Sequence, residues 1–139
     1  MGWSPFILTF VGGADEPVPV DLAVVRAVLE PHHVGDPRLI VRAAAELEFF
    51  VRAADGSEAE IFAGGRDTMV SRPHAGEVFG IIAELISRLG AVLLDPAGGA
   101  VCRAEDYAHL PADMRDGTVV VAEMTGETLV AALTASRRR

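Results

Sequence analysis

"RLIVRAAAELEFFVRAADGSEAEIFAGG" runs from Arg38 to Gly65, and the alternation of its side chains decides the fold. Alternation of apolar and polar side chains with a period of two over so long a run is typical of a β-strand with one buried and one solvent-exposed face. We therefore predict a strand from Leu39 to Ala53. Its even-numbered face carries charged side chains and would point outward. The predicted buried face is odd-numbered: Leu39, Val41, Ala43, Ala45, Leu47, Phe49, Val51 and Ala53.

The letters ADGS after this strand predict a hairpin turn, and the parity of the two strands selects its length. A two-residue Asp55-Gly56 loop would set Val51 opposite Glu60 and mix the two faces. A three-residue loop over 54–56, with Gly56 in the left-handed conformation, keeps like faces together, and we predict this loop. The expected cross-strand pairs are Val51–Ala59, Phe49–Ile61, Arg52–Glu58, Phe50–Glu60 and Glu48–Phe62.

The segments on either side of this hairpin read as two helices and two short strands. The apolar run Phe6 to Val11 predicts a strand that is covered on both sides or lies at the centre of a sheet. Asp21 is the expected N-cap of a helix, LAVVRAVL, that Pro31 ends. The apolar spacing of GEVFGIIAELISRLG predicts a second helix that stops at Gly90, and AVLLD then predicts a buried strand.

Gly98 and Gly99 follow that strand, as glycines do in a phosphate-binding loop. Such a loop needs its glycines to open directly into a helix, whose free N–H groups then face the anion. The chain instead continues as AVCR, which is extended, and no GK[ST] follows. The stretch from Asp95 to Gly98 therefore predicts a turn.

The order strand, helix, strand, strand, helix, strand over residues 6–95 is the split-βαβ pattern of ferredoxin-like domains. We expect one two-layer α+β domain over residues 1–139, an antiparallel sheet with helices on one face. Residues 96–136 would add a strand, TVVVAEM, and one or two helices, the last begun by Thr125 or Gly126. Arg137 to Arg139 would form a frayed basic tail.

Charge and cysteine content exclude several classes of function. The chain of 139 residues carries 20 acidic and 12 basic side chains, for a net charge of −8, which disfavours binding to nucleic acid. Its one cysteine cannot form an internal disulfide, and no CxxC spacing suggests zinc, so we expect no metal and no cofactor. The apolar run near the N-terminus is too short for a signal peptide or membrane span, so we expect a cytoplasmic protein.

Two loops hold residues that chemistry could use. His32 and His33 lie beside Asp36, but adjacent histidines rarely converge on one metal ion, and a surface loop is the favoured interpretation. The stretch Arg66 to Glu77 is predicted to be a long loop, with Asp67, Ser71 and His74 in it. A Ser-His-Asp triad is defined by geometry, and we instead expect His74 or Ser71 to serve the N-terminus of the next helix.

A third group lies in CRAEDYAHL. Glu105 and His109 are four residues apart on a predicted helix, where they would form either an acid–base couple or, as we favour, a surface contact beside a core-facing Tyr107. Cys102 is expected to be a small buried hydrophobe.

The outer face of the hairpin offers a different kind of site. Phe50 and Phe62 share that face with charged residues and are diagonal neighbours in the predicted register. Aromatic and arginine side chains are frequent anchors of protein–protein contacts. The partner-binding residues we expect are Phe50, Phe62, Glu48, Arg52 and Glu60. The C-terminal extension covering this face is the open alternative.

The pattern of a helix, then RLGAVLLDPAGGAV, then AED resembles that of small acidic proteins of high-GC bacteria, among them immunity proteins of toxin–immunity systems. The resemblance covers residues 76–106 and implies no catalytic or binding residue. It implies a small single-domain protein that binds another protein.

These observations lead to two main hypotheses. The first is an acidic cytoplasmic immunity-type protein that neutralises or regulates a protein partner, such as a basic toxin, through the outer sheet face. The alternative is an enzyme or ligand-binding protein built like the ferredoxin-like dimeric barrels, with His74, Tyr107 and His109 as catalytic candidates. It requires a closed apolar cavity lined by at least two of these residues. A plain homodimer that uses the same aromatic face is a third possibility.

Overall fold

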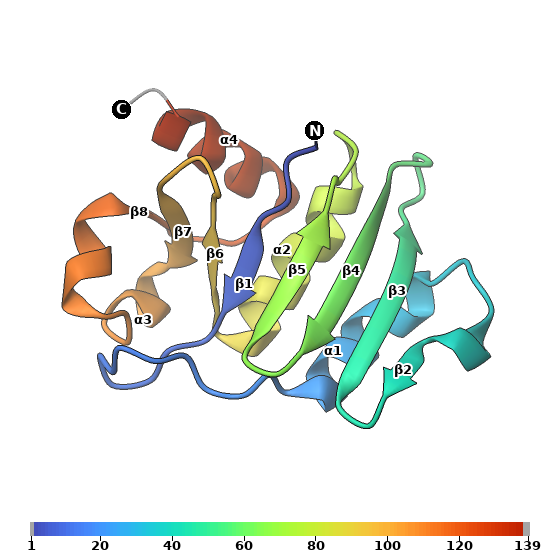
Figure 1. The fold of residues 1–139 in the computed structure, drawn as a ribbon. Helices are drawn as coiled ribbons and strands as arrows, with labels where there is room; N and C mark the ends of the chain where they lie inside the picture. Colours follow the sequence, from blue (N-terminus) through green and yellow to red (C-terminus); the bar gives the residue numbers. More distant parts are fainter. Residues whose placement is uncertain (1, 138–139) are drawn as a thin grey trace.

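The computed structural model describes residues 2–137 and shows one eight-stranded sheet with helices packed on it (Figure 1). The strand order is β2-β3-β4-β5-β1-β6-β7-β8, and only β7 and β8 run parallel. The strands are β1 (Phe6–Leu8), β2 (Val41–Ala43), β3 (Glu46–Arg52), β4 (Glu58–Gly64), β5 (Asp67–Ser71), β6 (Val92–Leu94), β7 (Ala100–Arg103) and β8 (Thr118–Val121). The helices are α1 (Leu22–Leu29), α2 (Val78–Leu89), α3 (Ala104–Tyr107) and α4 (Gly126–Arg137), with short 3-10 turns at Glu30–His32, Pro37–Leu39 and Ala112–Gly117.

The predicted α+β class is confirmed, and the ferredoxin-like arrangement is not. That arrangement would place the second strand of the hairpin, β4, beside β1. Instead β5 forms between them, in the segment that we expected to be a loop, and β1 pairs with β5 and β6. A two-residue turn with Gly65 at φ +58° joins β4 to β5, and only Thr68 and Val70 of β5 point into the core. Two inward side chains are too few for a period to be recognised in the sequence.

The long strand predicted from Leu39 to Ala53 is wrong in its first half. The chain reverses at Ala44 and Ala45, and β2 folds back so that Ala43 pairs with Glu46. Leu39 is 67% exposed while Ile40 is fully buried, the reverse of the predicted parity. Val41, Ala43 and Ala45 are exposed as well. Apolar residues continue to alternate through the turn, so the period of the sequence alone does not show that the chain reverses there.

The second half of the prediction is confirmed in detail. Leu47, Phe49 and Val51 are buried, and the predicted pairs all occur in the β3–β4 register. The loop has three residues, with Gly56 at φ +87° and a hydrogen bond from Ala53 N to Ser57 O of 2.9 Å. The two predicted helices also form, the strand predicted over Phe6 to Val11 forms at Phe6–Leu8 only, and Gly98 and Gly99 lie in the turn between β6 and β7.

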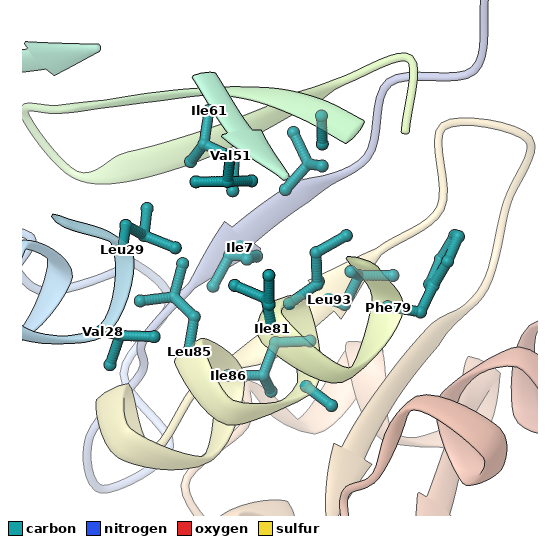
Figure 2. Close-up of a cluster of buried hydrophobic side chains, with 14 of the residues drawn as sticks. Ile7, Val28, Leu29, Val51, Ile61, Phe79, Ile81, Leu85, Ile86 and Leu93 are labelled. Carbon is teal, nitrogen blue, oxygen red and sulfur yellow. The ribbon is translucent and has the colours of Figure 1, made fainter. Parts of the chain in front are cut away.

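The main core lies between the inner sheet face and α1, α2 and α4. Figure 2 shows side chains of α1 and α2 meeting those of the strands. Helix α4 lies close against α2, since a Cβ on Gly126 would be 2.8 Å from the Gly80 nitrogen. Arg138 and Arg139 of the predicted basic tail lie outside the described residues, and α4 runs through Arg137. The labelled core residues are Ile7, Val28, Leu29, Val51, Ile61, Phe79, Ile81, Leu85, Ile86 and Leu93.

A second core occupies the other face of the sheet, so the prediction of helices on one face only is wrong. Residues 104–117, which we call the outer cover, contain α3 and the 3-10 turn before β8. Leu110, Tyr107 and Met114 of the outer cover pack on the outward side chains of β1, β6 and β7. The cause is the parallel β7–β8 pair, because the chain must cross over the sheet between two parallel strands. The buried members of this core are Phe10, Val92, Ala100, Cys102 and Leu110.

Candidate functional site

The outer cover reaches only half of the outer sheet face. The other half, over β3, β4 and β5, remains accessible, and we call it the open face; it presents Glu48, Phe50, Arg52, Glu60, Phe62 and Met69. Phe50 is 41% exposed, and Phe62 and Met69 are half-buried. The extension therefore does not bury the two aromatic residues that the sequence singled out.

Cross-strand register arranges the open face in rows. One row runs Glu48, Phe62, Met69, Phe6, and continues to Leu94 of β6. The apolar part of this row passes without a break from the open face to the covered half. The next row runs Phe50, Glu60, Ser71 and places a carboxylate beside the exposed ring. Met69 and Phe6 were missed in the sequence, because their place in the row depends on the unpredicted strand β5.

Phe50 is held in position by the loop before β2. The Phe50 amide donates to His33 Nδ1 over 3.1 Å, and its carbonyl accepts from the Val34 amide over 2.8 Å. The His33 ring also packs edge-on against Phe49, with ring centroids 6.0 Å apart. His33 is thus an edge partner of β3. Asp36 pairs with Arg38 by hydrogen bonds that lower the pKa of Asp36, and residues 2–137 contain no His, Cys, Asp and Glu cluster suited to a metal ion.

Charges on the open face are only partly neutralised. Arg52 and Glu58 form an ion pair of 2.9 Å, as predicted from the register, and Arg42 pairs with Glu48. Glu60 has no ion-pair partner within the described part of the chain. The open face therefore offers a free carboxylate next to an exposed aromatic ring.

Two shallow grooves hollow the open face. One, of about 360 Å³, is lined by Phe50, Glu60, Ser71, Arg72 and His74, among others. The second, of about 400 Å³, lies at the other end and is lined by Phe6, Phe62 and Met69 with charged neighbours. Each groove is thus next to one of the two aromatic residues. An interface core of this kind needs pockets that a side chain of the partner can fill.

Arg72, at the edge of the first groove, has a strained backbone. Its φ is +42°, and it precedes Pro73, which disfavours helical backbone conformations in the preceding residue. A non-glycine residue in such a region costs on the order of 1–3 kcal/mol. The conformation is held by hydrogen bonds from its amide to Trp3 O (3.1 Å) and Ser4 Oγ (3.3 Å). It turns the chain away from β5 at the border of the open face.

His74 and Ser71 do not cap α2, contrary to our expectation. His74 Nδ1 accepts from the Glu58 amide (3.2 Å), so this histidine extends the edge of β4. Asp55 and Ser57 of the hairpin loop serve the helix instead, since Asp55 Oδ2 accepts from Glu77 N and Ser57 Oγ from Val78 N, each at 2.9 Å. The Ser57 hydroxyl and the backbone N–H groups of Glu77 and Ser57 lower the pKa of Asp55. Asp67 lies at the far end of β5 from Ser71, so a triad is not assembled.

The residues singled out in CRAEDYAHL lie in the covered half and have structural contacts. The Tyr107 hydroxyl donates to Arg115 O (3.3 Å), and His109 Nδ1 accepts from Gly12 N (3.0 Å). Glu105 lies 3.6 Å from Arg103 in an ion pair instead of meeting His109. Cys102 is fully buried, and burial, together with the Asp106 carboxylate, raises its pKa to about 11. A thiol in that state stays protonated at neutral pH and is a poor nucleophile.

The three catalytic candidates of the enzyme hypothesis are not brought together. His74 lines an open groove that contains neither Tyr107 nor His109, and the latter two belong to the outer cover. The closed apolar cavity that this hypothesis requires is therefore not formed around His74.

Comparisons with protein-family models, with curated proteins and with solved structures found no match to this chain. Among residues 2–137, none of the helices combines the length and the apolar character needed to cross a membrane.

Proposed function

We propose that this chain is a protein-binding domain that docks a basic protein partner on the open face, as a bacterial immunity protein docks the toxin it neutralises. The observation that carries the proposal is the 41% exposure of Phe50 in a row with Glu60, on the half of the sheet left free by the outer cover. Exposed apolar patches that are rimmed by polar residues mark interaction sites in many soluble domains.

Rigid support of the aromatic rings favours binding. Phe50 and Phe62 project from paired β-strands, and the loop at His33 holds the free edge of β3 at Phe50. Little side-chain and backbone freedom is lost when a partner covers rings that are already ordered. Truncation of such an anchor typically weakens binding by about 2 kcal/mol or more.

Charge determines the kind of partner. The chain has a net charge of −8, and Glu60 is not neutralised by an arginine of the described chain. A basic partner would be steered to this surface, and the attraction would weaken with added salt. Arg52 and Glu48 are already paired within the sheet, so their contribution would be to shape and hydrogen bonding more than to net charge.

The test begins with a tagged protein that captures its partner from the source bacterium, followed by purification of that partner and calorimetric titration. Phe50→Ala with Phe62→Ala should raise the Kd at least about thirtyfold, which corresponds to about 2 kcal/mol. The matched control is Val11→Ala with Val130→Ala, since these valines are 54% and 44% exposed and lie outside the open face. An unchanged Kd for the phenylalanine variant would contradict the proposal.

The homodimer is distinguished by sizing the purified protein. The proposal is supported if the protein is a monomer that binds the partner and if the variant with Phe50→Ala and Phe62→Ala no longer binds it. A dimer that dissociates on the same substitutions assigns the open face to a second copy of the chain. Glu60→Gln should also reduce the salt dependence of partner binding without altering the thermal melt.

A further inference from the structure

The two edges of the sheet differ in how well they are protected. The β2 edge has three residues, an irregular register with β3, and Arg42 in an ion pair. Short length, irregularity and charge are the usual ways of preventing another strand from adding to an edge. The β8 edge is also short, with four residues, but it lacks the other two features: residues 118–122 read TVVVA, without charge, proline or bulge.

The backbone of β8 is free on its outer side. Thr118 N donates to Arg115 O, but Val119, Val120 and Val121 have no backbone hydrogen bonds beyond the ladder with β7 in the part of the chain that the structure describes. A row of free N–H and C=O groups on a β-branched strand is a template for an added strand. Val120, 43% exposed, offers the side-chain contact that such a strand would cover.

Charges at the two ends of β8 select the occupant. Asp116 precedes the strand and Glu123 follows it, both exposed and neither in an ion pair within residues 2–137. A second copy paired antiparallel along β8 would bring its own Asp116 and Glu123 to the same edge. This adds like charges, and two chains of net charge −8 repel. A basic strand meets neither obstacle.

We propose that the β8 edge binds an extended segment of another protein, with basic residues at its ends and alternating apolar residues between, as a ninth strand. Main-chain hydrogen bonds to Val119–Val121 would supply affinity, and the two carboxylates would supply selectivity. This edge is distinct from the open face, and neither proposal depends on the other.

The experiment uses an end-blocked octapeptide, Arg-Val-Thr-Val-Thr-Val-Thr-Arg, long enough to extend past both ends of β8 with an arginine near each carboxylate. We expect it to bind and to slow amide hydrogen exchange at outward-pointing N–H groups of Val119 to Val121. Two control peptides test the mechanism. Glutamate in place of both arginines should weaken binding about tenfold, and N-methylation of alternate residues, which keeps the charge but removes one edge of N–H donors, should abolish it.

A matched pair of variants tests the site. Val120→Lys should weaken the arginine peptide about tenfold or more, because lysine blunts a strand edge and repels the peptide. Val130→Lys adds the same charge at an equally exposed valine of α4 and should leave binding unchanged. Thermal melts verify that both variants fold. Equal binding of the N-methylated peptide, or no effect of Val120→Lys, would overturn the proposal. So would a peptide-free dimer that Val120→Lys dissociates, which would assign the edge to a second copy.

Discussion

The two halves of the outer sheet face belong to one sheet, but one half lies under the outer cover and the other half is accessible to solvent. Over β1, β6 and β7 the outward side chains are mostly apolar, and the outer cover packs on them. Over β3, β4 and β5 most of them are charged, aromatic or otherwise polar, and they stay accessible. The row from Leu94 through Phe6 and Met69 to Phe62 crosses the boundary between the halves.

This difference shows how the sequence of a strand indicates whether one or both of its faces are buried. Val92 and Leu93 are both buried because a core lies on each side of β6, and their stretch reads as continuous apolar residues. In β3 burial alternates strictly, because only one side meets a core. Phe50 lies on the solvent-exposed side of this alternating strand, where its ring contacts the His33 ring and still remains 41% exposed.

The largest expected effect is a difference between the two halves in how much one substitution lowers the free energy of unfolding. Leu110 is 2% exposed between the outer cover and the sheet, so Leu110→Ala should lower the free energy of unfolding by about 2–5 kcal/mol. Phe50→Ala, on the open face, should lower it by about 1 kcal/mol or less. Urea denaturation of both variants checks this. Equal losses would mean that the open face is part of the folded core and would remove the basis of the comparison.

The next effect concerns pH and the covered half. The pKa of Cys102 is raised from 9.0 to about 11 in the folded protein, so the unfolded chain loses the thiol proton first as pH rises. The stability that Cys102 contributes should therefore be complete below pH 9 and decrease between pH 9 and about 11. Unfolding curves of the wild type and of Cys102→Ala, measured across this range, isolate the contribution. If the free energy of unfolding changed with pH in the same way for the wild type and for Cys102→Ala, the thiol would not be sheltered by the outer cover.

The smallest effect compares one ion pair from each half. Arg103 and Asp106 lie 2.8 Å apart with side chains only 22% and 13% exposed, whereas the Arg52 and Glu58 side chains are 52% and 40% exposed. Double-mutant cycles should give a coupling of about 0.2–1 kcal/mol for the Arg52 pair, reduced by salt. The Arg103 pair should show a larger coupling that salt reduces less. The reverse order would indicate that the outer cover does not shield charge.

As with the fold, some residues of the candidate site were predicted from the sequence and others were missed. Phe50, Phe62 and their charged neighbours were placed on one face from parity alone, because side chains two apart on a strand share a face whatever surrounds them. Met69 and Arg72 were missed because β5 was not recognised. The cap of α2 was also missed, since Asp55 and Ser57 are 22 and 21 residues before the amides they serve. A signal was available in the two glycines before β5, which permit a tight hairpin turn.

The sequence by itself determined the elements that repeat a local period, which are α1, α2 and the register of β3 with β4, and the presence of a strand at Phe6–Leu8 within a continuous apolar run. These depend on side chains a few residues apart, whose spacing is visible in the chain. Only the tertiary structure decided where β5 lies, that β2 folds back, and which half of the outer face is covered. The position of β5 beside β1 and the covered half depend on contacts between segments distant along the chain. Short segments such as β2 and β5 take their conformation from the neighbours they pair with.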